Sequence, residues 1–297
     1  MQPHETDITE QTKHIINSGG LTYDVFFNEY KHKLSIYASA QHIDRNSYYG
    51  AEEALNAYGK TKDLTAVGGA MYVGNMDNCL FSPATFTGGV EYQYNSLHDV
   101  MTGYQRDLRQ DVKIASGFVQ NEWKLDYFTI LAGFRLDKHN LVDKVIFSPR
   151  VNALWKPSDK LQGRLTWSTG FRAPQAYDED LHVAAVGGEA MEVRLAKGLK
   201  SEHSNSFSGS IDWTANFGHF QSNLLIEGFY TALNDVFYLE SIGTDPVSGT
   251  SVQERRNGNG ARVYGANIDY KIAHGKEAQL QLGFTVQRSR YTEAVRW

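Results

Sequence analysis

Hydrophobic and polar residues alternate along most of this chain with a period of two. Residues 161–171 show it clearly: the odd positions include Leu161, Leu165 and Trp167, whereas the even positions hold Gln, Arg, Thr, Ser and Gly. Such alternation places apolar and polar side chains on opposite faces of a β-strand. The same pattern predicts further strands at 84–95, 128–138, 202–214 and 278–286.

Less regular strands are predicted in the intervals between these segments, at 14–27, 33–43, 62–74, 112–124, 147–156, 219–240 and 252–272. The total is about twelve strands. Each is near or above the roughly 9–11 residues with which a tilted β-strand crosses a bilayer. The pattern therefore favours an all-β, antiparallel, transmembrane β-barrel.

The predicted connections alternate between short and long. Short turns are expected at Asn28–His32, Asn75–Asn78, Leu125–Tyr127, Pro157–Lys160, Ala215–Gly218 and Ala273–Lys276. Long loops are expected at 44–61, 96–111, 139–146, 172–201 and 241–251. Outer-membrane barrels have short turns on one side of the membrane and long loops on the other. Strands 219–240 and 252–272 exceed the length that a bilayer needs, so they predict a hairpin that projects on the long-loop side.

The direction of the strands predicts that this chain is a fragment. The first strand leads into a short turn and the last follows one, so both ends of the chain would lie on the long-loop side. A complete barrel begins and ends on the short-turn side and closes its own edges. We therefore expect an internal piece of a larger barrel.

Composition excludes several other classes of protein. The longest apolar stretches of the 297 residues, such as 128–134, are far short of the roughly 18–20 residues of a membrane helix. A net charge of -5 argues against binding to nucleic acid. The single Cys79 excludes a disulfide framework within the chain. No nucleophile elbow, zinc-protease or phosphate-loop motif is present, so neither an enzyme nor a cofactor is predicted.

Four segments carry a family resemblance. The text SPRVNALWKPSDKLQGRLTWSTGFRAP at 148–174 resembles a strand pair in the barrel of TonB-dependent outer-membrane receptors. In that family a long outer loop and a further strand follow this pair. Leu199, Glu202 and Ser204, within GLKSEHSNSFSGSIDW, match the sequence pattern of that further strand. Similar matches are FVQNEWKLDYFTILAGFRL at 118–136 and RVYGANIDY at 262–270.

The resemblance implies both a fold and a function. Such receptors have about 22 strands, so residues 1–297 would be an incomplete barrel domain of about twelve strands. The family's plug domain, and the TonB box that the inner-membrane energy machinery grips, are absent from it. The implied function is TonB-dependent uptake of a scarce ligand across the outer membrane of a Gram-negative bacterium. An iron–siderophore complex is the expected ligand, followed by cobalamin or haem.

The expected partners are that ligand, outer-membrane lipid, and TonB through the plug. Two alternatives remain open at this stage. One is a passive porin without an energy-coupling partner, and the other is a soluble β-rich binding protein. An upstream plug domain would separate a receptor from a porin, and extraction without detergent would indicate the soluble protein.

Loop 172–201 is the main candidate for ligand binding. Arg172, Tyr177 and His182 would supply a cation, a phenol and an imidazole, which suits an anionic metal chelate. His182 also lies where the histidine of haem-specific family members would lie, although an ordinary surface role remains open. Asp178 and Asp180 could bind a cation such as Ca²⁺, or simply be solvated.

Two further expectations concern the positions of aromatic and charged side chains. Tyr48 and Tyr49, in the loop predicted at 44–61, could stack on a planar ligand. Parity places arginines 135, 164 and 172 on the lumen face of the barrel. It places tryptophans 123, 155, 167 and 213 on the lipid face, where they would form interfacial girdles.

Overall fold

The computed structural model describes residues 2–5, 8–51, 55, 57–101, 106–174, 191–244, 246 and 251–292. Apart from one short 3-10 turn at Pro3–Glu5 (η1), its regular structure consists of β-strands. None of the described residues forms a helix that is long and apolar enough to cross a membrane.

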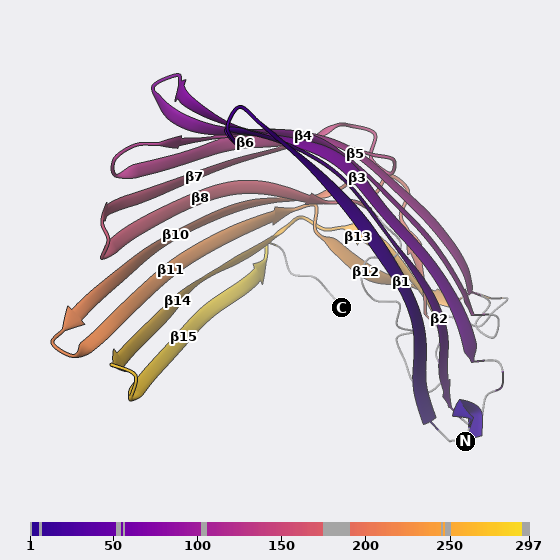
Figure 1. Cartoon of the computed structure of the whole chain (residues 1–297). Helices are drawn as coiled ribbons and strands as arrows, with labels where there is room; N and C mark the ends of the chain where they lie inside the picture. The colour runs from indigo at the N-terminus through magenta and orange to yellow at the C-terminus, as the bar shows by residue number, and fades with distance from the viewer. Residues whose placement is uncertain are drawn as a thin grey trace.

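Twelve strands form one antiparallel sheet. In spatial order they are β1 (Ile8–Phe27), β2 (His32–Ala51), β3 (Tyr58–Cys79), β4 (Ser82–Met101), β5 (Arg106–Lys124), β6 (Phe128–His139), β7 (Ile146–Ser158), β8 (Leu161–Arg172), β10 (Glu202–Phe217), β11 (Phe220–Asn234), β14 (Ala261–His274) and β15 (Ala278–Tyr291). The sheet curves into an open trough (Figure 1). This confirms the predicted antiparallel sheet of about twelve strands.

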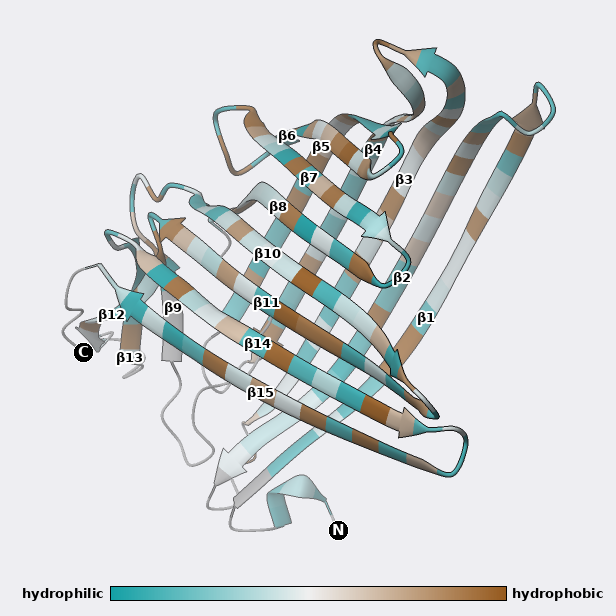
Figure 2. Ribbon diagram, turned by 90° about the vertical axis from the view of Figure 1, so that its left-hand side faces the viewer, coloured by the Kyte–Doolittle hydropathy of each residue, from teal (hydrophilic) through white to brown (hydrophobic). Residues whose placement is uncertain are grey.

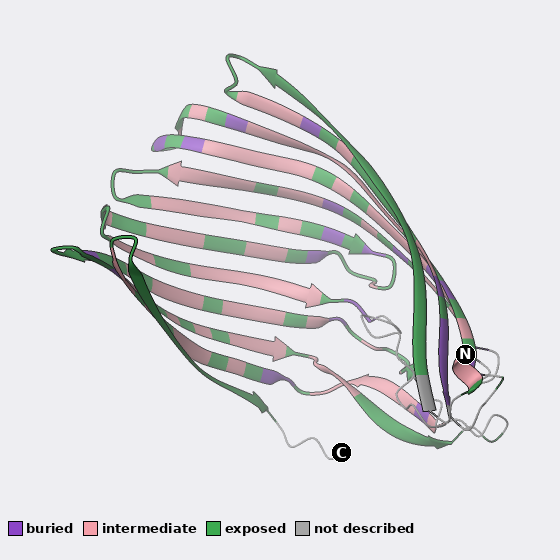
Figure 3. Ribbon diagram, turned by 60° about the horizontal axis from the view of Figure 1, so that its bottom comes forward, coloured by how far each residue is buried: buried purple, intermediate pink, exposed green. Residues whose placement is uncertain are grey.

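The two edges of the trough are β1 and β15, which do not pair with each other. Side chains along the described part of β1 and along all of β15 are exposed, as Figure 3 shows in green. Both edge strands therefore present unpaired backbone groups along one side, as the first and last strands of an unclosed barrel must.

A second, small sheet has three strands in the order β12 (Phe237–Thr244), β13 (Ser251–Asn257) and β9 (Met191–Leu195). β12 and β13 are antiparallel, whereas β9 runs parallel to β13. The small sheet lies at the long-loop end of the trough, within its concave side (Figure 1).

The two faces of the large sheet differ in polarity, as the alternation predicts. Hydrophobic and hydrophilic residues alternate along the strands in Figure 2. The polar face is the concave one, because Arg172 and Glu202 on that face contact Phe237 of the small sheet. The apolar face is convex. Residues that are partners in an antiparallel pair lie on the same face of the sheet. The register therefore assigns each residue of the twelve strands to the concave or the convex face.

The predicted positions of the tryptophans are confirmed. Each is paired in register with an apolar residue of the convex face: Trp123 with Ile130, Trp155 with Phe128, Trp167 with Phe207, and Trp213 with Leu161. Three of them lie within four residues of a short turn at the end of β5, β7 or β10. Aromatic side chains at that level are typical of the girdles at the edge of a bilayer.

Polar side chains on the concave face bond across strands that are not adjacent. Glu91 of β4 accepts a hydrogen bond from the Tyr37 hydroxyl at 2.7 Å and pairs with Nη2 of Arg135 at 2.9 Å. Arg135 also pairs through Nε with Asp137 at 2.8 Å. Residues 69 and 133 are glycines, and this leaves room for side chains to reach over their strands.

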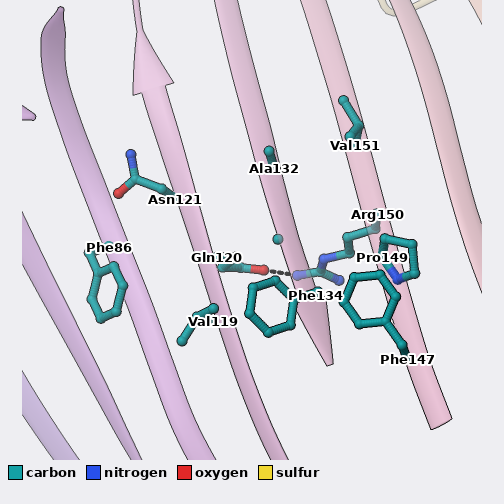
Figure 4. Close-up of a pocket in the computed structure, with 11 residues that line it drawn as sticks. Phe86, Val119, Gln120, Asn121, Ala132, Phe134, Phe147, Pro149, Arg150 and Val151 are labelled. Carbon is teal, nitrogen blue, oxygen red and sulfur yellow. Dashed lines mark hydrogen bonds between the residues drawn. The ribbon is translucent and has the colours of Figure 1, made fainter. Parts of the chain in front are cut away.

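At Gly133 a Cβ atom would lie 2.5 Å from Cβ of Gln120. Across this glycine Arg150 of β7 donates a hydrogen bond to Gln120 of β5 (Figure 4). On the opposite, convex face of the same strands, Phe134, Phe147 and Val151 line a groove of about 340 Å³. Strands two apart are thus joined on the polar face, whereas the adjacent strands β6 and β7 pack through Phe134 and Phe147 on the apolar face.

The first two long loops are much shorter than predicted. β2 continues to Ala51, and β3 begins at Tyr58. Likewise, β4 continues to Met101, and β5 begins at Arg106. β6 ends where His139 pairs with Ile114, so residues 106–113 of β5 extend past β6 by roughly 25 Å. The extended ends of β1 to β5, which we call the outer wall, comprise residues 8–19, 40–51, 58–66, 94–101 and 106–113.

The outer wall contains a buried ion pair on its concave face. Nη2 of Arg45 donates to the Thr61 hydroxyl at 2.9 Å and lies 3.5 Å from Oδ1 of Asp99. Thr61 in turn donates to Asp99 at 2.5 Å. All three side chains are buried. Because a buried charge is stable only when it is paired, this cluster ties β2, β3 and β4 together beyond the apolar band.

The predicted projecting hairpin at 219–240 and 252–272 is wrong. The predicted strand 219–240 is interrupted at Asp235, which has a φ of 53°. The predicted strand 252–272 is interrupted at Gly260, which has a φ of 143°. The ends beyond these breaks form β12 and β13, which turn away from the large sheet to pair with β9. The part that projects is instead the outer wall.

Candidate functional site

The candidate site lies where β8 and β10 meet the small sheet. Arg172 is the last residue of β8, and Glu202 is the first residue of β10. The two are partners in register on the concave face. Phe237 begins β12, and its backbone N–H donates to Oε2 of Glu202 at 3.0 Å. This contact fixes the start of the small sheet against the rim of the trough.

Two arginines lie over the ring of Phe237. Cζ of Arg172 is 5.7 Å from the ring centroid, and Cζ of Arg255 on β13 is 5.8 Å from it. Cation–π contact holds each guanidinium near the ring. We call these three residues the Arg172–Phe237–Arg255 cluster. Its two planar donor forks suit carboxylate, phosphate or other anionic oxygen atoms.

The neighbouring Arg256 pairs with two carboxylates. Nη1 of Arg256 lies 2.5 Å from Oε2 of Glu240, and its Nε lies 2.5 Å from Oε2 of Glu254. The hydrogen bond that Arg256 Nε donates to the Glu254 carboxylate is the main reason why the pKa of the Arg256 guanidinium is raised above its usual value. Arg255 and Arg256 are adjacent in a strand, so they point to opposite faces of the small sheet.

Asn257 joins the two long loops of this region. Its Oδ1 accepts from the backbone N–H of Lys200 at 2.8 Å, and its Nδ2 donates to the carbonyls of Lys200 at 3.0 Å and Asp235 at 2.7 Å. The N–H of Ala196 also donates to the carbonyl of Arg255 at 3.1 Å. Segments that are 57 residues apart in sequence are therefore held as one unit.

Replacing Asn257 by leucine is expected to loosen this junction. The variant loses three hydrogen bonds, and hydrogen exchange at the Lys200 amide should become faster by about tenfold or more. Hydrogen–deuterium exchange with mass spectrometry measures this. Asn223→Leu is the control, because Asn223 bonds Asp212 and Thr214 on the concave face, away from this junction. Unchanged exchange at Lys200 in the Asn257 variant would contradict the assignment.

A cavity of about 580 Å³ lies beside the junction, at the rim of the trough. It is formed by the connection between β6 and β7 together with the segment that precedes β10. Its lining includes Val145, Lys144, Lys200, Ser201 and Asp235. The lining of this cavity therefore combines apolar and charged groups.

The predicted site residues have different outcomes. Arg172 lies in the cluster described above and on the predicted concave face. Tyr177, Asp178, Asp180 and His182 lie outside the described residues, so their roles remain predictions. Among the residues that the structure does describe, no three His, Cys, Asp or Glu side chains gather in a way that could hold a metal ion.

The placement of Tyr48 and Tyr49 in a loop is wrong. Both belong to β2, in the outer wall, and each is only 1% exposed. They point to opposite faces, and the ring of Tyr48 packs against that of Tyr58 with centroids 4.8 Å apart. Tyr49 packs with Met101. Neither ring is open to a planar ligand in this arrangement.

Sequence reasoning missed Phe237, Arg255 and Asn257, because all three fell inside predicted strands. A local signal was available at 257–260, where the sequence reads NGNG. Such Asn-Gly pairs mark turns rather than strand interiors. Dividing the overlong strand at this point would have separated β13 from β14.

Comparisons with known proteins agree with this geometry. The family model described as TonB dependent receptor-like, beta-barrel matches residues 4–296. No curated protein matches the chain. Several solved structures of bacterial receptors are similar to it in fold.

The siderophore receptor PirA from Pseudomonas aeruginosa has a TM-score of 0.76 at 15% identity, over 94% of this chain and 51% of that one. A ferric enterobactin receptor variant from the same organism, in complex with enterobactin, has a TM-score of 0.70 at 14% identity, over 93% and 44%. The FrpB iron transporter from Neisseria meningitidis matches at 15% identity, over 94% and 45%. The chain thus spans about half the length of these receptors.

Proposed function

Because the chain belongs to the TonB-dependent receptor-like β-barrel family, we propose that it forms part of a receptor in the outer membrane of a Gram-negative bacterium. The proposed cargo is an anionic ferric siderophore complex that is taken up with energy from TonB through a plug domain. Cobalamin and haem are the second and third candidates. The proposed activity is transport and not catalysis.

The observation that carries this proposal is the Arg172–Phe237–Arg255 cluster. It places two guanidinium groups at the long-loop end of the trough, on the polar concave face. A ferric chelate with net negative charge would meet this pair before it enters the lumen. Binding residues concentrate in such loops on a rigid strand scaffold. The similar solved structures include a siderophore receptor and a ferric enterobactin receptor, which supports this class of cargo.

A growth assay tests the proposal. The intact gene would be expressed in a host that lacks its own siderophore, haem and cobalamin receptors, with and without TonB. We expect TonB-dependent growth on a ferric siderophore as the iron source. Growth without TonB would indicate a passive channel, and growth only on haem or only on cobalamin would reassign the cargo.

The same assay tests the role of His182. The His182→Ala variant should grow normally on a ferric siderophore, since an anionic chelate needs cations and not an axial ligand. On haem the variant should lose most of its growth, because haem iron is commonly ligated by histidine. Equal growth of both proteins on haem would remove His182 from consideration.

A further inference from the structure

The step in height between β5 and β6 leaves one side of β5 open in the outer wall. β6 ends at His139, opposite Ile114, whereas β5 begins at Arg106. On its other side β5 is paired with β4 along residues 106–123. The open side therefore lies between two neighbouring strands in the interior of the large sheet, away from its edge strands β1 and β15.

Asn140 closes the foot of this step by continuing the ladder with its side chain. The backbone N–H of Asn140 donates to the carbonyl of Lys113 at 3.0 Å. Its Oδ1 accepts from the N–H of Lys113 at 2.9 Å, and its Nδ2 donates to the carbonyl of Asp111 at 2.8 Å. The chain then leads to β7, so Asn140 is the last residue to pair with β5 on this side.

Beyond Asn140 the backbone of β5 offers a row of hydrogen-bonding groups. Alternate residues of a strand direct their N–H and C=O groups to the same side, so Arg109 and Asp107 point theirs as Asp111 and Lys113 do. Within the described part of the chain, the N–H of Asp111 and both backbone groups of Arg109 and Asp107 make no hydrogen bond on this side. Such a row is a template for one more strand.

The side chains beside these groups alternate in charge. Asp107, Arg109 and Asp111 lie on the convex face, because they have the same parity as Trp123 in this strand, and all three are exposed. Opposite charges stabilise a cross-strand pair, whereas like charges directly opposite each other destabilise it. The edge therefore disfavours an apolar strand and selects one with a basic, an acidic and a basic residue at alternate positions.

The loops of this chain do not supply that pattern. Residues 52–56, 102–105, 175–190 and 245–250 contain no lysine or arginine. A second copy in the same membrane fits poorly as well. A two-fold axis along the membrane normal would make the two β5 strands parallel and set each charge beside the same charge. The complementary strand must accordingly come from a different protein.

We propose that the open side of β5 at residues 107–111 binds an extended segment of another protein, which adds a strand to the outer wall. The segment runs antiparallel to β5 and carries basic, acidic and basic residues opposite Asp111, Arg109 and Asp107. Its intervening side chains are uncharged and lie beside Leu108 and Gln110 on the concave face. In this mode main-chain hydrogen bonds supply affinity and alternate side chains supply specificity. The inference goes beyond transport and is independent of the cargo.

The test measures binding of labelled peptides to the purified intact receptor in detergent by fluorescence anisotropy. The probe is the peptide Thr-Lys-Val-Glu-Val-Lys-Thr. Its charge-reversed counterpart, Thr-Glu-Val-Lys-Val-Glu-Thr, should bind at least about tenfold more weakly, because three opposite-charge pairs become three like-charge pairs. Equal binding of the two peptides would overturn the proposed charge pattern.

A third peptide separates strand addition from simple attraction of charges. It is the probe with an N-methyl group on the glutamate, which removes the N–H that would donate to the carbonyl of Arg109. This peptide keeps every charge but should bind at least about fivefold more weakly than the probe, since a hydrogen bond is lost and the methyl group blocks close approach. Unchanged affinity would show that no ladder forms and would overturn the proposal.

A charge exchange in the receptor provides the matched variant. Arg109→Glu should bind the probe about tenfold more weakly than the wild type, and it should bind Thr-Lys-Val-Lys-Val-Lys-Thr at least about tenfold more tightly than the wild type does. This gain also shows that the variant is folded. Lys60→Glu, the control, makes the same change of charge on β3, two strands away, and should leave probe affinity within about twofold. An equal loss in the control, or no gain in Arg109→Glu, would overturn the assignment.

Hydrogen–deuterium exchange shows whether the edge is open in the receptor itself. The amides of Asp107, Arg109 and Asp111 should exchange rapidly in the free receptor and about tenfold or more slowly with the probe bound. The amides of Leu108 and Val112 face β4 and should be protected in both states. Slow exchange at the first three amides without peptide would mean that the receptor covers this edge itself, and it would overturn the proposal.

Discussion

Replacing Leu165 by arginine is expected to block assembly of the barrel in the membrane. Leu165 lies in the middle of β8 on the convex face, and the residue is 68% exposed. A cation on the lipid face near the bilayer midplane costs about 2–4 kcal/mol. Arg164, the preceding residue, already places the same kind of side chain on the opposite face. The expected effect therefore comes from the face and not from the charge itself.

Gln162→Arg is the matched control for this prediction. Gln162 lies on the concave face of the same strand, and its Nε2 donates to Oδ2 of Asp212 at 3.2 Å. An arginine there can pair with Asp212, so assembly should continue. Heat-modifiable mobility of outer-membrane fractions on gels measures folding of both variants. If the two behave alike, the assignment of faces in β8 is wrong.

Removing both guanidinium groups from the Arg172–Phe237–Arg255 cluster should have the largest effect on ligand binding. Each charge-assisted bond to an anionic ligand contributes roughly 1.5–3 kcal/mol. The Arg172→Ala, Arg255→Ala double variant should therefore bind a ferric siderophore about 100-fold more weakly or worse. Isothermal titration calorimetry on the intact receptor in detergent gives the Kd.

Arg256→Ala provides the comparison. Arg256 is adjacent to Arg255 but points to the other face of the small sheet, where Glu240 and Glu254 neutralise it. Its removal should change the Kd little. If the double variant binds as the wild type does, the cluster is not the ligand site. Tyr177 and His182 then become the residues to replace.

The period-two pattern predicted the sheet well where one face is apolar. In 161–171 and 202–214 it placed every side chain on the correct face, and the register confirms the pairing of these two strands. The signal exists because one face of each strand is apolar and the other is polar. It therefore also predicted the convex position of all four tryptophans on the sheet.

The same pattern could not reveal the outer wall. Beyond the apolar band, β2 continues through Asp44, Arg45, Asn46 and Ser47, which are polar on both faces. Without a difference between the faces no alternation remains, and such a segment looks like a loop. These residues are held in strands by pairing with β1 and β3 and by the buried Arg45–Asp99 pair.

The candidate site was less accessible to sequence reasoning than the fold. Arg172 could be identified because it ends a strong strand on the polar face. Its neighbours Phe237 and Arg255 are brought to it by the break in the strand at Asp235 and by parallel pairing of β13 with β9. Pairing between segments about 60 residues apart has no signature in local sequence.

The bonds of Asn257 have a consequence for protein engineering. They make residues 196–200 and the β12–β13 hairpin a single structural part that is assembled from two loops. A graft that transfers one of these loops into another receptor would leave the Asn257 side chain, or the Lys200 backbone, facing a surface that cannot bond to it. Specificity should accordingly pass between such barrels only when residues 173–201 and 235–260 are exchanged as a pair, and separate exchange of either should yield a well-formed barrel with a disordered entrance.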